Sequence, residues 1–334
     1  MKKSLLILFF TCWALFFAAF RPVMPFAAET AAFPDGTPVT GGRILMGTIG
    51  EPSNLIPYMA SDSASGEITG LLYVAPLKYD KDLNVVPWAA ASYEVLEGGR
   101  LLRFVLRDDI RWEDGVPLTA DDVEFTYKLM IDPKTPTAYS GDFLAIESFK
   151  KTGRLSFEVR YAKPFARSLM TWMGAILPKH VLEGQDIMTT PVARKPIGAG
   201  PYRLAKWDAG SMLTLTASDT YFEGRPNLDE VVYRIIPDPS TMFLELKAGK
   251  LDMMSLSPQQ YLRQTQGPQW ERDWRKYRYL SFSYTFLGFN LEHPFFKNVR
   301  VRRAISMAID RQSLIDGVLL GQGVPTVGPY KPGT

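Results

Sequence analysis

The sequence predicts an α/β protein that contains more than one folded unit. Two segments, residues 101–107 and 155–161, alternate apolar and polar side chains with the period of two that half-buried strands show. Residues 298–320 instead space their apolar side chains as a pair of helices does. The chain has 334 residues, 46% of them hydrophobic, which is more than one ordinary core accommodates. Strands and helices are therefore expected in two units or more.

The first 28 residues have the composition of a secretory signal peptide. Lys2 and Lys3 precede an apolar run over residues 5–20, and an alanine-rich stretch follows it. The run is shorter than the roughly 20 residues that span a bilayer, which favours a cleaved signal over a membrane anchor. Cys12 lies in the middle of the run, whereas a lipid-attachment cysteine follows small residues at its end. These features predict a free periplasmic protein.

The residue inventory of the exported part excludes several kinds of site. Cys12 is the only cysteine, so the exported chain can form no disulfide, thiolate metal site or cysteine nucleophile. His180 and His293 are the only histidines. They lie far apart in the sequence and could share a metal only with help from carboxylates, so both are interpreted as surface residues. No metal or other cofactor is predicted.

The charge balance of the exported part argues against a nucleic-acid partner. The whole chain has 38 basic and 35 acidic side chains, and the signal segment carries three of the basic ones and no acidic one. The remainder is therefore close to neutral. A nucleic-acid-binding protein needs a basic surface excess.

The exported chain begins with a strand and a polar loop. Residues 43–47 form a short apolar run, and residues 51–57 interrupt it with two prolines. A strand that ends in an irregular polar loop is a natural ligand rim. The following segment, which contains Ser61, Asp62 and Ser63, is dense in hydroxyl groups and precedes an apolar helix. Its simplest interpretation is a helix N-terminus capped by its own side chains.

A carboxylate pair at residues 121 and 122 is interpreted as helix capping. Asp114 and Gly115 form a tight turn. Thr119 is expected to cap the following helix, and Asp122, three residues later, completes a capping-box pattern. Asp121 and Asp122 also favour the positive end of that helix. Capping explains these carboxylates, so no catalytic role is assigned to them.

A glycine pair at residues 198 and 200 is a poor nucleotide-binding motif. Pro201 follows directly, no third glycine stands at the required spacing, and the next element is a strand instead of a helix. Further along, residues 213–217 and 231–236 are expected to be strands. Pro239 is expected to start a helix that Gly249 ends, before a strand-like segment at residues 251–254.

Residues 289–329 resemble the signature of the peptide-binding (family 5, cluster C) extracellular solute-binding proteins of ABC importers. Asn298 can cap the first helix of this segment and Asp310 the second, which carries Val318 and Leu319. Gly321 and Gly323 are expected to stop that helix. Segments near residues 51–57, 112–125, 197–204 and 221–254 also resemble family elements and occur in the family's order. The resemblance covers nearly the whole exported chain.

The resemblance implies a periplasmic-binding-protein-like two-lobed fold with an extra small subdomain. Residues 41–74 and 196–275 would form a discontinuous first lobe, residues 75–195 the small subdomain, and residues 276–334 the start of a second lobe that is incomplete. The chain is therefore expected to be a C-terminally truncated fragment. Such a fragment should leave apolar faces of the helices at 298–320 without partners and should fail to trap a ligand.

The function implied by the resemblance is capture of di- or oligopeptides and their delivery to an ABC permease in the inner membrane. Ser61, Asp62 and Ser63 would then be polar contacts in the ligand cleft. Phe289 and Asn290 would lie at the junction of the lobes, although core packing is the favoured interpretation of Phe289. Hinge closure around the ligand is the expected mechanism, and the protein is expected to be a monomer.

Other solutes and an enzymatic function are the alternatives. Family relatives bind sugars, nickel complexes or haem; the seven tryptophans leave oligosaccharide stacking open, and the two histidines disfavour a direct metal site. The sequence lacks Gly-x-Ser-x-Gly, a Walker loop and His-Glu-x-x-His. A hydrolase would therefore have to use paired carboxylates, as glycosidases do. The sequence favours a binding protein that is not an enzyme.

Overall fold

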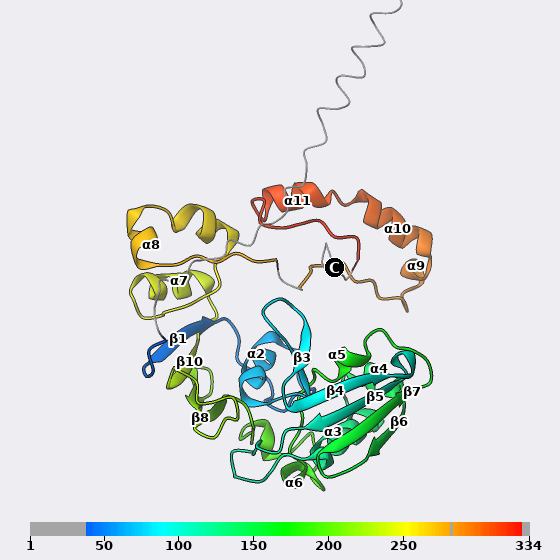
Figure 1. Ribbon diagram of the computed structural model, residues 1–334. Helices are drawn as coiled ribbons and strands as arrows, with labels where there is room; N and C mark the ends of the chain where they lie inside the picture. The colour runs from blue at the N-terminus through cyan, green and yellow to red at the C-terminus, as the bar shows by residue number, and fades with distance from the viewer. Residues whose placement is uncertain (1–37, 281–282, 329–334) are drawn as a thin grey trace, which may run out of the picture. The chain divides into compact units, whose positions relative to one another are not determined.

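The computed structural model describes residues 38–280 and 283–328 (Figure 1). Its contacts divide the chain between Ser255 and Leu256 into two compact units. We call residues 38–255 the larger unit and the described residues 256–328 the smaller unit. The predicted lobe boundaries at residues 74, 195 and 275 remain predictions. The predicted signal peptide and Cys12 lie outside the described residues.

One sheet of the larger unit joins the start of the chain to a segment far along it. Its strand order is β1-β10-β9-β8, with β1 and β10 parallel and the other pairs antiparallel. Arg43 pairs with Glu230, so the intervening chain forms a long excursion from this sheet. The predicted strands near residues 43, 213 and 231 are confirmed. The bounds are β1 (Arg43–Thr48), β8 (Tyr202–Asp208), β9 (Met212–Ala217) and β10 (Glu230–Ile235).

The excursion forms a second, antiparallel sheet with the order β4-β5-β7-β6. The two alternating segments of the sequence are its central strands, β5 and β7. Phe104 of β5 lies opposite Phe157 of β7, and the centres of their stacked rings are 4.8 Å apart. Trp172 packs against both rings. The bounds are β4 (Ala90–Leu96), β5 (Leu101–Leu106), β6 (Ile146–Lys151) and β7 (Ser156–Tyr161).

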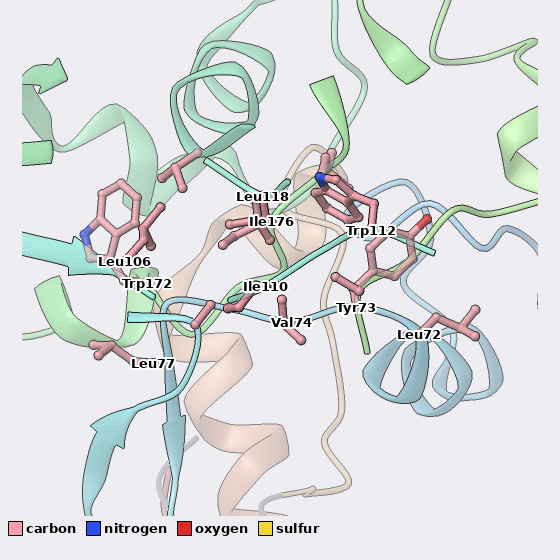
Figure 2. Close-up of a cluster of buried hydrophobic side chains, with 14 of the residues drawn as sticks. Leu72, Tyr73, Val74, Leu77, Leu106, Ile110, Trp112, Leu118, Trp172 and Ile176 are labelled. Carbon is pink, nitrogen blue, oxygen red and sulfur yellow. The ribbon is translucent and has the colours of Figure 1, made fainter. Parts of the chain in front are cut away.

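Short helices and a two-stranded ribbon complete the larger unit. Most of the buried hydrophobic side chains of the larger unit form one continuous cluster, part of which Figure 2 shows. The remaining elements are α2 (Ser63–Leu72), β2 (Leu77–Tyr79), β3 (Val85–Pro87), η2 (Glu97–Gly99), α3 (Ala120–Ile131), α4 (Ser140–Leu144), α5 (Ser168–Thr171), α6 (Lys179–Leu182), η3 (Pro191–Ala193) and α7 (Pro239–Lys247).

The glycines at 198 and 200 allow two backbone segments to meet. Gly200 N donates a hydrogen bond to Leu72 O at 2.9 Å, at the end of α2. A Cβ atom on Gly198 would lie 1.9 Å from the same carbonyl oxygen, and one on Gly200 would lie 2.5 Å from Leu71 O. Close backbone approach therefore accounts for both glycines, in agreement with the rejection of a nucleotide motif.

The same junction contains a carboxyl group whose pKa is raised. Glu113 N donates a hydrogen bond to Gly198 O at 2.9 Å. Burial raises the pKa of the Glu113 carboxyl to about 7, Arg203 opposes this rise, and Asp114 adds to it. The pKa of the Tyr73 hydroxyl is also raised. Burial is the main cause, and the negative charge of Glu113 is the second. Ionised Glu113 is thus disfavoured in the folded protein.

We expect the stability of the larger unit to fall as Glu113 ionises. Its folded pKa lies above its ordinary value of 4.5, so its contribution is fully present below about pH 4.5 and is lost as the pH rises through about 7. Urea unfolding between about pH 5 and 8 should show this loss, and Glu113→Gln should remove it. Glu183→Gln, at an exposed position, should keep it. An identical pH dependence in wild type and Glu113→Gln would contradict the assignment.

Helix α3 begins in the predicted capping box. The Thr119 hydroxyl accepts a hydrogen bond from Asp121 N at 3.2 Å, and Asp122 Oδ2 accepts one from Thr119 N at 2.8 Å. The second oxygen, Asp122 Oδ1, accepts a hydrogen bond from Lys179 N at 3.0 Å, at the start of α6. Asp122 therefore caps α3 and also joins it to α6, which the sequence pattern did not predict.

This double role should make Asp122 more important for stability than Thr119. At Asp122, which is 4% exposed, substitution by alanine leaves two backbone N–H groups without their acceptor, and we expect a loss of about 2–3 kcal/mol. Thr119→Ala should cost about 1 kcal/mol. Asp121→Ala, which removes an exposed ion pair with Lys151, should cost less than about 1 kcal/mol. Urea denaturation measures all three, and equal losses would contradict this ranking.

The smaller unit is helical. Its elements are the π-helical turn η4 (Gln260–Gln264), α8 (Pro268–Asp273), α9 (Pro294–Lys297), α10 (Val299–Ala308) and α11 (Arg311–Gly317). The predicted caps are confirmed: Asn298 Oδ1 accepts from Arg300 N, and Asp310 Oδ1 accepts from Ser313 N, both at 3.0 Å.

The predicted length of the last helix is wrong. Helix α11 ends at Gly317, so Val318 and Leu319 follow the helix and are exposed. A glycine weakens a helix, and Leu320 and Gly321 then adopt positive φ angles of 51° and 76°, which end it.

No helix among the described residues is long and apolar enough to cross a membrane.

Candidate functional site

A groove of about 350 Å³ lies along α2 in the larger unit. Helix α2 contributes residues at i, i+1, i+4 and i+5, which share one face, and the other lining residues come from five further segments of the unit. We call this feature the α2 groove. Its lining residues are Asn54, Ile56, Pro57, Tyr58, Ala60, Ser65, Gly66, Thr69, Gly70, Tyr73, Val74, Ala75, Trp88, Tyr139, Met173, Gly174 and Ala175.

The loop between β1 and α2 forms one rim and is fastened at its start by Glu51. Glu51 Oε1 accepts a hydrogen bond from Trp207 Nε1 at 2.5 Å, and Glu51 Oε2 accepts one from Gly210 N at 3.2 Å. The Arg194 guanidinium lies 3.8 Å from the centre of the Trp207 ring. These contacts hold the predicted ligand-rim loop against β8 and the turn that follows it.

The predicted segment at residues 61–63 forms the capped start of α2. Asp62 Oδ1 accepts a hydrogen bond from Ser65 N at 2.8 Å, and Asp62 Oδ2 accepts one from Ser53 Oγ at 2.5 Å. Burial alone would raise the pKa of Asp62, but the hydrogen bonds from Ser53 and Ser65 outweigh it and lower the pKa. Ser61 and Ser63 are exposed. Ser65, one turn further along, lines the groove, as does Thr69.

Ser65 and two glycines shape the floor of the groove. Ser65 Oγ accepts a hydrogen bond from Ser53 N at 3.0 Å and donates one to Asp62 Oδ2 at 2.9 Å. Because Ser65 is thereby engaged with the rim loop, it positions that loop. A Cβ atom added to Gly66 or Gly70 would meet nothing within 4 Å. The groove is therefore open directly above the backbone of α2.

Tyr58 fixes one end of the groove in a strained conformation. Its φ of 73° is unusual for a residue other than glycine. The Tyr58 hydroxyl donates a hydrogen bond to Ala175 O at 2.8 Å, and Tyr58 O accepts one from Thr137 Oγ1 at 2.8 Å. A Cβ atom on Gly174 would lie 2.3 Å from the Tyr58 hydroxyl. Gly174 is therefore required for this placement of Tyr58.

Trp88 forms an aromatic wall that a polar network holds in place. Its indole Nε1–H donates to the Tyr221 hydroxyl at 2.9 Å and to Glu223 Oε2 at 3.2 Å. Lys78 Nζ donates to Glu223 Oε1 at 2.7 Å and lies 5.3 Å from the centre of the Trp88 ring. Burial alone would raise the pKa of Glu223, but Lys78 and Tyr221 lower it. The wall is thus preorganised.

Tyr139 and Met173 complete the apolar lining. The Tyr139 ring meets the Tyr58 ring edge-on at 6.1 Å, and its hydroxyl contacts Ala60 O at 3.5 Å. Tyr139 remains 45% exposed, so it is available to a ligand. No sequence pattern indicated Tyr58, Trp88, Tyr139 or Met173 as lining residues, because isolated aromatic or methionine residues in loops carry no motif.

The other two predicted ligand contacts, Phe289 and Asn290, belong to the smaller unit. The Phe289 ring packs at 5.2 Å from the Phe296 ring, which agrees with the packing interpretation of this residue. Asn290 Oδ1 accepts a hydrogen bond from Glu292 N at 3.0 Å in an exposed turn. A ligand-binding role for either residue remains a prediction.

The geometry of the α2 groove suits binding. Its lining combines aromatic rings, small residues and a few polar groups, as is usual in solute-binding pockets. None of the lining residues has a carboxylate, amine, guanidinium or imidazole side chain. Within the described residues there is also no cluster of three or more His, Cys, Asp or Glu side chains that could hold a metal ion.

Known proteins resemble both the sequence and the fold. The family described as "Bacterial extracellular solute-binding proteins, family 5 Middle" matches residues 84–334. The oligopeptide-binding protein AppA of Bacillus subtilis is 32% identical over 89% of this chain and 55% of its own length. Protein XP55 of Streptomyces lividans is 31% identical over 91% of this chain and 55% of its own length. The chain thus spans little more than half the length of these relatives.

Two solved structures extend the comparison. Bacillus subtilis AppA in complex with a nonapeptide has a TM-score of 0.79 and 31% identity, and the match covers 89% of this chain and 59% of AppA. NikZ from Campylobacter jejuni in complex with Ni(L-His) has a TM-score of 0.76 and 26% identity, with 86% and 57% covered. The predicted periplasmic-binding-protein fold is confirmed. The chain belongs to family 5 of the bacterial extracellular solute-binding proteins.

Proposed function

We propose that the protein is the periplasmic substrate-binding component of an ABC importer for peptides. It would capture a di- or oligopeptide and deliver it as a monomer to permease subunits in the inner membrane, without breaking a bond. The observation that carries this proposal is the preorganised α2 groove in a chain that is similar to a peptide-bound AppA structure. The names of the curated relatives, which include several putative ABC transporter peptide-binding proteins, support the same function.

The groove offers a peptide both surface and hydrogen-bonding groups. Trp88 and Tyr139 can pack against side chains, and Asn54 and Thr69 are half-buried polar residues of the lining. Capture would follow from closure of a two-lobed fold, in which the ligand stabilises the closed state by its greater affinity for it. Ser61, Ser63, Phe289 and Asn290 remain proposed contacts, whereas the Asp62 carboxylate already has its capping partners.

A metal complex is the second candidate, because NikZ in complex with Ni(L-His) is also similar to this chain. Native mass spectrometry of full-length protein purified from the periplasm distinguishes the two, since the mass of the bound molecule identifies its class. We expect co-purified peptides, and stoichiometric binding when defined tripeptides are added to the stripped protein. A co-purified nickel complex, together with no binding of any peptide, would contradict the proposal.

The same purified protein tests two further points: whether the signal peptide is removed on export, and whether bound peptides stay uncleaved. N-terminal sequencing should show that the segment before about residue 28 has been removed, and protein that begins at Met1 would contradict cleavage. Peptides recovered after prolonged incubation should have their original masses. Release of more than one equivalent of shortened peptide per protein molecule would show that the protein is a hydrolase.

A further inference from the structure

We propose that the α2 groove accepts an uncharged side chain of the peptide, apolar or aromatic, and rejects a charged one. This inference rests on the proposed function and specifies which kind of peptide side chain the groove binds. None of the lining residues of the groove carries a charged side chain. Its larger side chains are instead those of Tyr58, Tyr73, Trp88, Tyr139 and Met173.

Two carboxylates that contact lining residues of the groove are already compensated. Asp62 carries three hydrogen bonds at the N-terminus of α2, where the helix dipole favours a negative charge. Glu223 is paired with Lys78 and accepts hydrogen bonds from Trp88 and Tyr221. A charged ligand side chain would therefore lose hydration in the groove without gaining an ionic partner, which is unfavourable.

The size and floor of the groove fit a bulky side chain with adjoining main chain. Its volume of about 350 Å³ lies at the lower end of the range for small-ligand pockets. Gly66 and Gly70 stand inside α2, where glycine weakens a helix, and nothing lies within 4 Å of an added Cβ at either position. Open space at these helical positions lets a ligand approach the backbone closely. Met173 has an unbranched, flexible side chain and can adapt to different apolar shapes.

The test is a panel of tripeptides measured by isothermal titration calorimetry on the full-length protein. In each peptide one residue is Leu, Phe, Asp or Lys, and this residue is placed at each of the three positions in turn. At one position or more, the Leu and Phe peptides should bind at least tenfold more tightly than the Asp and Lys peptides, because only the latter bring an unpaired charge into the groove.

A substitution assigns this preference to the groove. Met173→Lys adds a cation to the lining at nearly constant side-chain length, and Met188→Lys adds the same charge at a position that is 62% exposed and outside the groove. At the charge-sensitive position, Met173→Lys should improve binding of the Asp peptide at least tenfold and weaken binding of the Lys peptide. Met188→Lys should leave both affinities unchanged.

The outcomes separate this inference from the proposed function. Tight peptide binding with no position that discriminates against charge would overturn the inference and leave the proposed function intact. Discrimination that Met173→Lys does not alter, in a variant with an unchanged melting temperature, would also overturn it by placing the selection elsewhere. If no peptide binds at all, the proposed function fails, and the inference fails with it. If Met173→Lys does not fold, the wild-type panel still overturns the inference when no position discriminates against charge.

Discussion

Replacing Gly198 by alanine is expected to destabilise the larger unit by about 3 kcal/mol or more, at the upper end of the cost of overpacking. The added Cβ would lie 1.9 Å from Leu72 O and 2.8 Å from Leu72 C. These are backbone atoms at the end of α2, so relief requires a shift of the helix or of the turn at residues 197–201. Because α2 is the floor of the groove, ligand affinity should fall as well.

The matched control is the same substitution at Gly70. A Cβ atom there meets nothing within 4 Å, and alanine is favoured over glycine in a helix by up to about 1 kcal/mol. Gly70→Ala should therefore raise the free energy of unfolding, while Gly198→Ala lowers it. Urea denaturation of both variants measures this difference in sign. Unchanged stability of Gly198→Ala would contradict the close approach of the two backbones.

Replacing Trp88 by alanine is expected to weaken peptide affinity about 30-fold or more, which corresponds to roughly 2 kcal/mol, as for central aromatic residues of interfaces. The substitution removes the aromatic wall of the groove and also takes the indole donor from Tyr221 and Glu223. Trp88→Phe keeps a ring in the groove but removes that donor. It should therefore retain most of the affinity and lose some stability.

Calorimetry with one peptide, together with thermal unfolding, separates the two roles of Trp88. Tyr79→Ala is the control, because Tyr79 is 40% exposed on the neighbouring strand β2 and does not line the groove. It should bind peptide as the wild type does. Full peptide affinity in Trp88→Ala would show that the aromatic wall of the α2 groove does not contact the bound peptide.

Sequence patterns predicted the strands and helix caps that depend on interactions between residues close together in the chain. The alternation in β5 and β7, the capping box at Thr119 and the caps Asn298 and Asp310 each depend on neighbours in the sequence. Helix α11 was predicted too long, because its apolar spacing continues past Gly317. The backbone then adopts positive φ angles at Leu320 and Gly321, which the spacing of apolar residues does not reveal.

The α2 groove could not be predicted in the same way. Trp88, Tyr139 and Met173 come from three loops, and only the tertiary fold brings them to the same groove as α2. The hydroxyl-rich segment lies beside the groove, although Ser65, rather than residues 61–63, lines it. Asp62 shows why: its carboxylate forms the helix cap, and this local hydrogen bonding accounts for its presence without a ligand.

The most direct test of the α2 groove as a ligand wall is amide hydrogen exchange of the full-length protein with and without saturating peptide. Binding there should slow exchange in three segments that line the groove, near residues 54–60, 65–75 and 173–175. The outer strand β6 (Ile146–Lys151), which contributes nothing to the lining, should exchange at the same rate in both states. Equal exchange of all three groove segments with and without bound peptide would contradict the account.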